Sequence, residues 1–319
     1  MSQDRVLVTG GAGFIGSNIV DALLSDGSYT VRVLDSFATG HRGNLAHCLS
    51  DIELVEGDIR DVETVEEAVD GVQLILHEAA LPSVSRSVKA PVTTNAVNVE
   101  GTLKLLSAAR RAGVKRVVLA SSSSVYGDGH ELPKSEEMPP RPMSPYAVTK
   151  LAAENFCRVF SEIYGLETLA LRYFNVFGPR QDPTSQYSGV IARFATCALK
   201  NIPYRVFGDG LQSRDFSFID NIVHANLLAL RAPRVTGQVV NVACGERITL
   251  LDMIAILNSL VGREIAVEFV PPRPGEVRHS QAAIGRAAEL LDYHPVVDFR
   301  EGLARTFAWY REQDTVPVV

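Results

Sequence analysis

The sequence predicts an α/β protein with a doubly wound parallel sheet and a smaller, interleaved C-terminal lobe. In the first half, short apolar runs rich in β-branched residues alternate with segments of helical periodicity. The runs cover residues 5–9, 31–35, 52–55, 73–77 and 116–120, and a glycine-rich turn follows the first of them. In such sheets, ligands bind outside the carboxyl ends of the strands. Functional residues are therefore expected where these runs end.

Size and composition narrow the class of protein. A length of 319 residues indicates one large domain with an added lobe, or two domains. The net charge of -6 argues against nonspecific nucleic-acid binding. No apolar run approaches the roughly 18 residues of a membrane span, and the first residues lack a signal-peptide pattern, so we expect cytoplasmic residence and no membrane contact. The four cysteines lack Cys-x-x-Cys spacing, so neither a disulfide framework nor a metal site is expected.

The turn after the first strand has the spacing of a dinucleotide-binding loop. Its glycines fit Gly-x-Gly-x-x-Gly from Gly11 and Gly-x-x-Gly-x-x-Gly from Gly10, and a helix pattern follows. Such glycines let backbone N–H groups approach a pyrophosphate at a helix N-terminus, which predicts a Rossmann domain. Asp35 ends the second strand, roughly twenty residues after the glycines, where a carboxylate can bind the ribose diol of a dinucleotide. Its charge would repel a 2′-phosphate, which favours NAD over NADP. The alternative is an ordinary Asp that caps a turn.

Three later strand ends are predicted to line one cleft with this turn. They are Gly57-Asp58, the segment 77–80 and the serine run 121–124. Asp58 would then lie near the adenine, and Ala79-Ala80 on the nicotinamide side. A serine-rich turn is the alternative for the serine run.

A helix that starts after Ser144-Pro145 carries the candidate acid/base pair. Tyr146 and Lys150 stand one turn apart on one face. A fixed ammonium beside a phenol favours the phenolate and is expected to lower its pKa. Tyr146 is therefore a credible proton acceptor. For an isolated Tyr-x-x-x-Lys, an amphipathic helix with a packed Tyr and a solvated Lys is the alternative.

Together these motifs resemble the extended short-chain dehydrogenases/reductases. The resemblance rests on 9–16, Asp35, 57–58, 77–80, 121–127 and 146–150, in matching order and spacing. It implies that Tyr146 is the acid/base, that Lys150 holds the nicotinamide ribose and that Ser122 donates to the sugar hydroxyl. It also implies NAD-binding positions at Gly10, Gly13, Phe14, Ile15, Gly16, Asp35, Asp58, Ile59, Ala79, Ala80, Asn98, Tyr146 and Lys150.

The second half begins with a turn-rich crossing at 175–183. Helix patterns at 190–199 and 221–230 and strand patterns at 204–207 and 239–242 follow, and the last is expected to return to the sheet. We therefore assign 1–175, with 215–242 returning to it, to the NAD-binding Rossmann domain. The lobe is assigned to 176–214 and 243–319, mainly for nucleotide-sugar binding.

Four arginines in turn-rich segments, Arg180, Arg214, Arg273 and Arg278, suit a diphosphate, although scattered surface arginine is the alternative for any one of them. The resemblance matches Asn175, Arg214 and Arg273 to phosphate-binding positions of the nucleotide-sugar branch, with Tyr204 near the uracil. A UDP-sugar is thus the implied substrate. Its expected contacts are Ser83, Ser122, Ser123, Asn175, Val190, Tyr204, Arg214, Arg273, Glu276 and Ser280.

Within that branch, dehydratases and decarboxylases carry an acid at the Ser122-Ser123 position, whereas this chain has only hydroxyls. The implied reaction is 4-epimerisation. The segments 81–87 and 278–281 resemble UDP-N-acetylglucosamine 4-epimerases. In the register of this family, Ser280 is the gate residue of the sugar pocket, and its small side chain leaves volume for an N-acetyl group. Plain UDP-glucose and UDP-galactose remain candidate substrates. The alternatives are a UDP-glucuronate 4-epimerase, a net NAD-dependent oxidoreductase of nucleotide sugars, and a non-catalytic NAD-binding regulator. A homodimer through the helices around 98–110 and 151–164 is expected from relatives.

Overall fold

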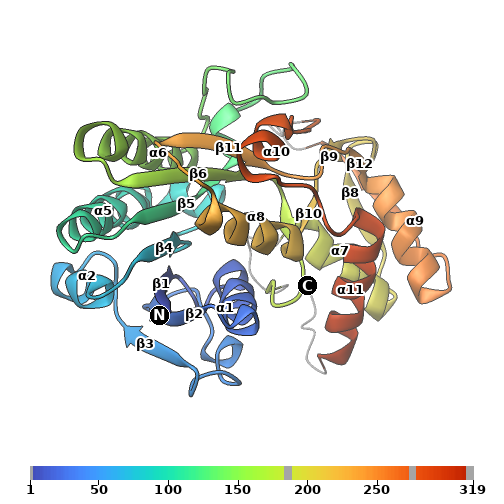
Figure 1. Ribbon diagram of the computed structural model, residues 1–319. Helices are drawn as coiled ribbons and strands as arrows, with labels where there is room; N and C mark the ends of the chain where they lie inside the picture. The colour runs from blue at the N-terminus through green and yellow to red at the C-terminus, as the bar shows by residue number, and fades with distance from the viewer. Residues whose placement is uncertain (1–2, 183–188, 273–277, 314–319) are drawn as a thin grey trace.

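A seven-stranded, wholly parallel sheet forms the centre of the computed structural model, which describes residues 3–182, 189–272 and 278–313 (Figure 1). The strand order is β11-β6-β5-β4-β1-β2-β3. The strands are β1 (Asp4–Thr9), β2 (Tyr29–Asp35), β3 (Ile52–Glu56), β4 (Leu74–His77), β5 (Arg116–Ser122), β6 (Glu167–Tyr173) and β11 (Gln238–Val242). The prediction of a doubly wound parallel sheet is confirmed, and the sheet reverses its winding between β1 and β4.

Helices cover both faces of this sheet because alternate strand residues point to opposite sides. Val6 and Val8 of β1 pack in the cluster that includes α1 and α8, whereas Leu7 packs in the cluster of α2, α5 and α6. These helices are α1 (Phe14–Asp26), α8 (Ile219–Arg231), α2 (Val62–Val69), α5 (Thr102–Arg111) and α6 (Pro145–Tyr164). The core therefore has two apolar layers, one on each face.

The segment before α5 is helical, with an interruption at Ala90 and an irregular turn next to α5. It consists of α3 (Val84–Lys89), α4 (Pro91–Asn95) and the π-helical η2 (Ala96–Gly101). Single-turn π segments are often found at functional sites. Two 3₁₀ turns complete this half: η1 (Arg42–Asn44) and η3 (Ser123–Tyr126).

The second lobe lies beside the sheet, on the right in Figure 1. Its helices are α7 (Val190–Lys200), α9 (Leu250–Val261), α10 (Gly285–Leu291) and α11 (Phe299–Glu312). Its strands pair in twos: β8 (Tyr204–Phe207) with β13 (Val267–Val270), β9 (Ser213–Arg214) with β12 (Ile248–Thr249), and β7 (Val176–Phe177) with β10 (Ser217–Phe218). Phe177 contacts the rings of Phe216, Phe218 and Phe299. This aromatic cluster joins the crossing segment to the lobe.

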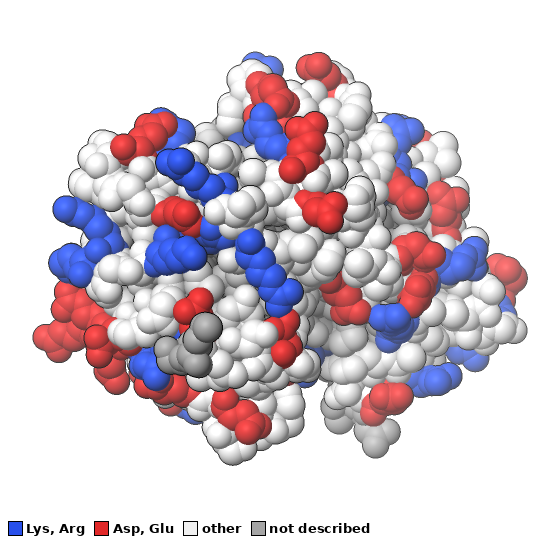
Figure 2. Space-filling model, viewed as in Figure 1, with Lys and Arg blue, Asp and Glu red and all other residues white. Residues whose placement is uncertain are grey.

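Within the described part of the chain, no helix has the length and apolar character that a membrane span requires. On the face shown in Figure 2, basic side chains are interspersed with acidic ones.

Candidate active site

A cavity of about 870 Å³ lies where the strands of the sheet end. Its wall is built by the glycine turn, by the segments after β2, β3 and β4, by α6, and by the crossing segment. Its lining includes Gly10, Gly13, Phe14, Ile15, Gly16, Asp35, Asp58, Ile59, Glu78, Ala79, Ala80, Tyr146, Lys150, Gln181 and Asp182. Most of the residues predicted to bind the cofactor therefore share one cavity.

The glycine turn approaches its neighbours too closely for side chains. Gly10 has φ +71°, and a Cβ there would lie 2.8 Å from the backbone of Ala79, while a Cβ on Gly16 would lie 2.2 Å from the Gly10 carbonyl oxygen. The helix that follows, α1, has Gly13 as its N-cap residue, so it has no side-chain cap, and its first turn carries no acidic residue. Free N–H groups and the positive end of a helix dipole suit a pyrophosphate. The turn thus fits the dinucleotide that its sequence predicts.

The Asp35 carboxylate fixes this turn to the end of β2. Its Oδ2 accepts from the Ala12 N–H at 2.8 Å and its Oδ1 accepts from the Phe37 N–H at 2.7 Å. The turn-capping interpretation thus describes part of its role. A ribose diol can still bind, because each carboxylate oxygen has two lone pairs. At the end of β3, Asp58 pairs with Arg60 at 2.7 Å, and the hydrogen bond from that guanidinium lowers the pKa of Asp58.

The start of α6 brings Tyr146 and Lys150 together. Ser144 caps the helix by accepting from the Ala147 N–H at 3.2 Å, and Pro145 occupies its first turn. Lys150 Nζ lies 5.9 Å from the Tyr146 ring centre and donates to the Ala120 carbonyl oxygen at 2.7 Å. The Ser122 hydroxyl lies close enough to Tyr146 to lower its pKa, and it accepts from the Ser124 N–H at 3.2 Å. Three residues with predicted catalytic roles therefore form one constellation.

The expected lowering of the Tyr146 pKa is wrong for this site. Burial raises the pKa of Tyr146 to about 12, Ser122 opposes the rise, and Glu78 adds to it. Burial also lowers the pKa of Lys150 to about 8. Desolvation outweighs attraction here because both groups leave water and the ammonium donates to a carbonyl instead of to the phenol.

The first residue of the serine run points into the interior of the protein. Ser121 was expected to line the cleft, but its hydroxyl donates to Glu154 at 2.5 Å inside the protein. Glu154 lies on α6, one turn beyond Lys150, and makes a two-pronged pair with Arg172 of β6 at 2.8 and 2.9 Å. The strand period of two explains the difference, because Ser121 and Ser122 point to opposite faces. Sequence reasoning missed the buried pair.

Three of the predicted substrate-binding residues lie around β9 of the second lobe. Asn175, with φ +37°, donates from Nδ2 to the Asp215 carbonyl at 2.8 Å and to Ser280 Oγ at 3.4 Å. The Ser280 N–H donates to the Ser213 carbonyl at 3.1 Å, and Arg214 is the next residue of that strand. The Asp215 side chain holds the surrounding backbone by accepting three N–H groups, those of Cys244, Gly245 and Ala282.

Other predicted substrate contacts lie elsewhere or serve local structure. Ser83 caps α3 by accepting from the Arg86 N–H at 3.0 Å, Ser123 begins η3, and Val190 begins α7. Arg273 and Glu276 lie outside the described residues.

Asn98, assigned to the cofactor, is buried behind the cavity wall. It accepts from the Leu81 N–H at 2.8 Å and donates to Thr149 Oγ1 at 3.1 Å. It therefore ties the segment after β4 to α6.

The placement of Tyr204 near the uracil is wrong. Its side chain is fully buried at 0 % exposure, packs on Phe194, and donates to Asn258 Oδ1 at 3.2 Å. In β8, Tyr204 and Val206 face the lobe's core, and Arg205 and Phe207 face outward. Tyr204 is thus a packing residue.

Two of the four candidate phosphate arginines are paired with carboxylates. Arg180 contacts Asp21 of α1 at 2.6 Å, and Arg278 contacts Asp209 at 2.6 Å. Their assignment to a diphosphate is therefore not favoured by this geometry. Arg214 donates from Nη1 to the carbonyl oxygens of Ser213 and Arg278, both at 3.0 Å.

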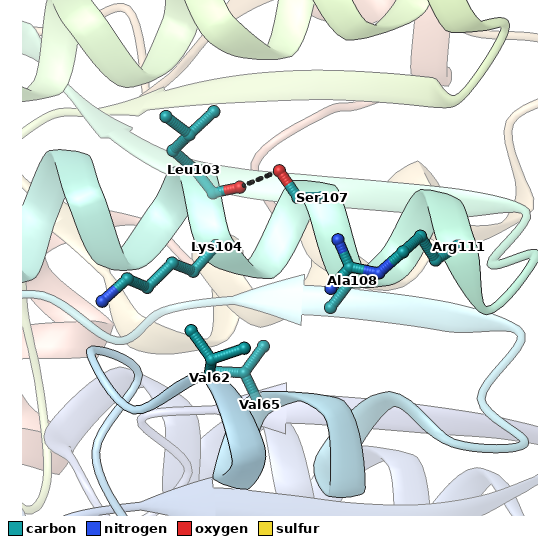
Figure 3. A pocket seen from close by; sticks show the side chains of 7 residues that line it. All are labelled: Val62, Val65, Leu103, Lys104, Ser107, Ala108 and Arg111. Carbon is teal, nitrogen blue, oxygen red and sulfur yellow. Dashed lines mark hydrogen bonds between the residues drawn. The ribbon is translucent and has the colours of Figure 1, made fainter.

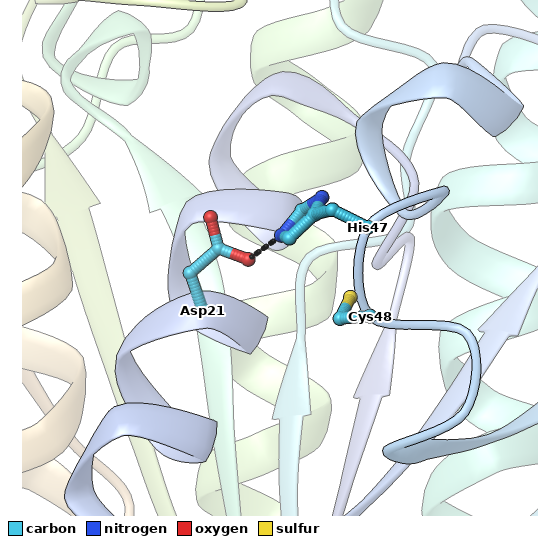
Figure 4. A group of neighbouring side chains, drawn as sticks. All are labelled: Asp21, His47 and Cys48. Carbon is cyan, nitrogen blue, oxygen red and sulfur yellow. Dashed lines mark hydrogen bonds and ion pairs between the residues drawn. The ribbon is translucent and has the colours of Figure 1, made fainter.

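The Asp21 carboxylate also belongs to a group of metal-ligand type residues (Figure 4). Asp21 Oδ1 and His47 Nε2 are 2.8 Å apart, and the Cys48 thiol donates to the Leu45 carbonyl at 3.4 Å. Because Arg180 already occupies the other oxygen of Asp21, we interpret the group as a tie between α1, the segment after η1 and the crossing segment.

A second hollow, of about 280 Å³, lies between α2 and α5 (Figure 3). Its basic residues have partners: Lys104 donates to the Arg60 carbonyl at 2.5 Å, and Arg111 pairs with Glu66 at 2.6 Å. The hollow is lined by Val62, Val65, Leu103, Lys104, Ser107, Ala108 and Arg111. It contains none of the predicted site residues.

Comparison with known proteins places the chain in a family. Residues 6–243 match the model of the NAD dependent epimerase/dehydratase family. The UDP-glucose 4-epimerase of Mycolicibacterium smegmatis is 40% identical over 313 residues, which are 97% of this chain and 99% of that protein.

Two solved structures extend the likeness to three dimensions. The UDP-N-acetylglucosamine 4-epimerase of Methanobrevibacter ruminantium, in complex with UDP-N-acetylmuramic acid, is 37% identical, with a TM-score of 0.93 over 98% of this chain and 100% of that one. The UDP-glucuronic acid 4-epimerase of Bacillus cereus, in complex with UDP-glucuronic acid and NAD, is 32% identical, with a TM-score of 0.88 over 96% and 99%. The resemblance to extended short-chain dehydrogenases/reductases is thereby confirmed. The chain belongs to the NAD-dependent epimerase/dehydratase family and is an enzyme with NAD as its cofactor.

Proposed function

We propose that this enzyme interconverts UDP-N-acetylglucosamine and UDP-N-acetylgalactosamine, and also accepts UDP-glucose and UDP-galactose. The coarser conclusion does not depend on the sugar: the chain is a NAD-dependent UDP-sugar 4-epimerase, an isomerase. The observation that carries the proposal is the grouping of Tyr146 and Lys150 at one cavity, with Ser122 close enough to Tyr146 to lower its pKa and a hydroxyl instead of an acid at Ser123. Without a further acid at that position, hydride removal and return is the simplest chemistry.

The residues of the chain supply the proton chemistry. NAD, held by the glycine turn and Asp35, would supply a reversible hydride acceptor for C4 of the sugar. In its phenolate form, which the positive charge of Lys150 favours and burial opposes, Tyr146 takes the proton of the 4-hydroxyl, while Ser122 donates a hydrogen bond to the same oxygen. Lys150, held by the Ala120 carbonyl, keeps a positive charge beside them. The resulting 4-keto sugar turns to present its other face, and Tyr146 then returns the proton. Binding energy has to come mainly from the UDP part, so that the hexose is free to turn.

The assignment of an N-acetylated sugar rests on Ser280. The hydrogen bond from Asn175 and the backbone contact with Ser213 support a position for Ser280 beside the phosphate-binding candidates. A small side chain leaves volume next to them, and a bulky one would fill it.

One experiment separates the candidates. The purified enzyme is incubated with UDP-N-acetylglucosamine, UDP-glucose and UDP-glucuronate, and the products are resolved while absorbance at 340 nm is followed. Epimers of the first two sugars without net NADH support the proposal. Turnover of UDP-glucuronate alone would make the enzyme a uronate epimerase, and stoichiometric NADH would make it an oxidoreductase. A chain that binds NAD but turns over none of these sugars would be the non-catalytic regulator.

We also propose which part of the chain binds each ligand, and that the protein forms a homodimer. Residues 1–175 with 215–242 hold NAD, and 176–214 with 243–319 hold the UDP-sugar. Exposed apolar side chains on neighbouring helices, Val88 of α3, Val92 of α4 and Val148 of α6, support a homodimer through this side of the sheet domain. Light scattering of the wild type and of Val92→Asp checks the assembly. Cytoplasmic residence stays a prediction.

A further inference from the structure

Glu78 is an acidic group of the cavity that the mechanism leaves unused. It follows His77, the last residue of β4, and borders the cavity that Tyr146 and Lys150 also line. All four residues of β4 are buried. Burying an ionised carboxylate beside such a strand costs free energy unless nearby groups stabilise its charge.

Two hydrogen bonds in series prepare Glu78 to carry that charge. The Tyr173 hydroxyl donates to Glu78 Oε1 at 2.8 Å, and Asn226 Nδ2 donates to the Tyr173 oxygen at 2.8 Å. The amide is held in this orientation because Nδ2 also donates to the Ile222 carbonyl at 2.9 Å. The tyrosine oxygen thus accepts from Asn226, and its single proton is directed to Glu78. Donation to a carboxylate favours the ionised form.

The titratable groups around Glu78 belong to α6, β6 and β4, and α8 contributes the uncharged Asn226. Burial raises the pKa of Glu78 to about 7, opposed by Tyr173 and by Lys150. Burial lowers the pKa of His77 to about 3 and raises that of Tyr173 well above its usual value, so both are neutral at pH 7. The charge of Glu78 also helps to keep Lys150 protonated, whereas it raises the pKa of Tyr146. Glu78 therefore does not assist the base directly.

We propose that Glu78 acts through its negative charge. Its carboxylate, held in place by Tyr173, favours the oxidised cofactor and the charged form of Lys150. This inference rests on the proposed function. C4 of the sugar loses its hydride, which is two electrons with one proton, and the hydroxyl on the same carbon gives its proton to Tyr146. The hydride is therefore accepted close to Tyr146. Its acceptance removes the positive charge of the nicotinamide ring. A nearby carboxylate stabilises the ring more before transfer than after it. The bias returns the hydride to the keto sugar and leaves the enzyme oxidised for the next turnover.

The test measures the bound cofactor without sugar or turnover. The holoenzyme is titrated with dithionite and mediator dyes, and the NAD/NADH couple is followed at 340 nm. Glu78→Gln keeps an acceptor for Tyr173 but removes the charge. At pH 8 its potential should lie about 30 mV above that of the wild type, which corresponds to a tenfold change in the oxidation equilibrium of a two-electron couple. At pH 5.5, where Glu78 is protonated in the wild type, the two potentials should coincide. Glu162→Gln, an exposed change on α6, should match the wild type throughout.

Equal potentials of Glu78→Gln and the wild type at pH 8 would overturn the proposal. Tyr173→Phe gives a second measurement that does not depend on the folding of the first variant. This variant removes the donor that lowers the pKa of Glu78, so Glu78 should ionise at a higher pH than in the wild type. The potential of the variant should therefore separate from that of Glu78→Gln only at a higher pH. A potential with the same pH dependence as in the wild type would also refute the proposal. Failure to epimerise any UDP-sugar would instead refute the proposed function, and the titration would still be measurable.

Discussion

Replacing Glu154 by Gln tests how firmly α6 is anchored behind the active site. Glu154 and Arg172 are each 4 % exposed at the side chain, and Glu154 also accepts from Ser121, the neighbour of Ser122. Gln keeps nearly the same shape but leaves the guanidinium without a countercharge. Breaking one side of a buried pair typically costs about 3 to 5 kcal/mol.

The size of the expected effect follows from the length of the chain. With an unfolding entropy of about 2.1 cal/mol/K per residue, 319 residues lose roughly 1.5 °C of melting temperature per kcal/mol. Glu154→Gln should therefore melt about 5 to 8 °C below the wild type in differential scanning calorimetry. The matched control is Glu162→Gln on the same helix, whose pair with Arg158 is half exposed and should be worth less than about 1 kcal/mol.

Two further outcomes decide between explanations. The double variant Glu154→Leu with Arg172→Met removes both charges and should recover most of the loss, because well-packed apolar side chains often replace a buried pair without cost. If Glu154→Gln melts like Glu162→Gln, the reasoning from burial is refuted.

The remaining predictions concern catalysis and selectivity. Tyr146→Phe should lower kcat by roughly 10²- to 10⁴-fold and leave UDP binding by calorimetry unchanged; near-normal turnover would exclude Tyr146 as the base. The cofactor extracted from the purified enzyme should be NAD, because Asp35 repels a 2′-phosphate, and recovery of NADP would contradict this role. Ser280→Tyr should shift the ratio of kcat/KM values from UDP-N-acetylglucosamine toward UDP-glucose by roughly ten- to a hundredfold, whereas equal losses on both would show that Ser280 is not the gate.

Local patterns predicted those parts of the molecule that depend on neighbours in sequence. The glycine turn, the strand that ends at Asp35 and the one-turn spacing of Tyr146 and Lys150 each lie within one strand or helix, where periodicity fixes the geometry. The sheet order then brought these segments to one cavity, as expected for strand ends.

Long-range pairing was outside the reach of the sequence pattern. Nothing in the spacing indicates that Arg180 contacts Asp21, that Arg172 contacts Glu154, or that Tyr173 donates to a strand-end acid. The error at Tyr204 has a related cause. The alternation within β8 separates its two faces, but only packing against the lobe decides which face is buried.

The two ends of the site are held in different ways, which suits a reaction in which one part of the substrate turns and the other does not. At the catalytic end, side chains are anchored through the interior: Lys150 to the Ala120 carbonyl and Ser121 to Glu154. In the lobe, Asn175 and Ser280 contact each other and the backbone around β9. A 4-epimerase needs its acid/base and hydride acceptor fixed while the hexose changes the face that it presents. Rigid anchoring is therefore required behind Tyr146, whereas the lobe that we propose to bind the nucleotide has to retain only the UDP part of the substrate.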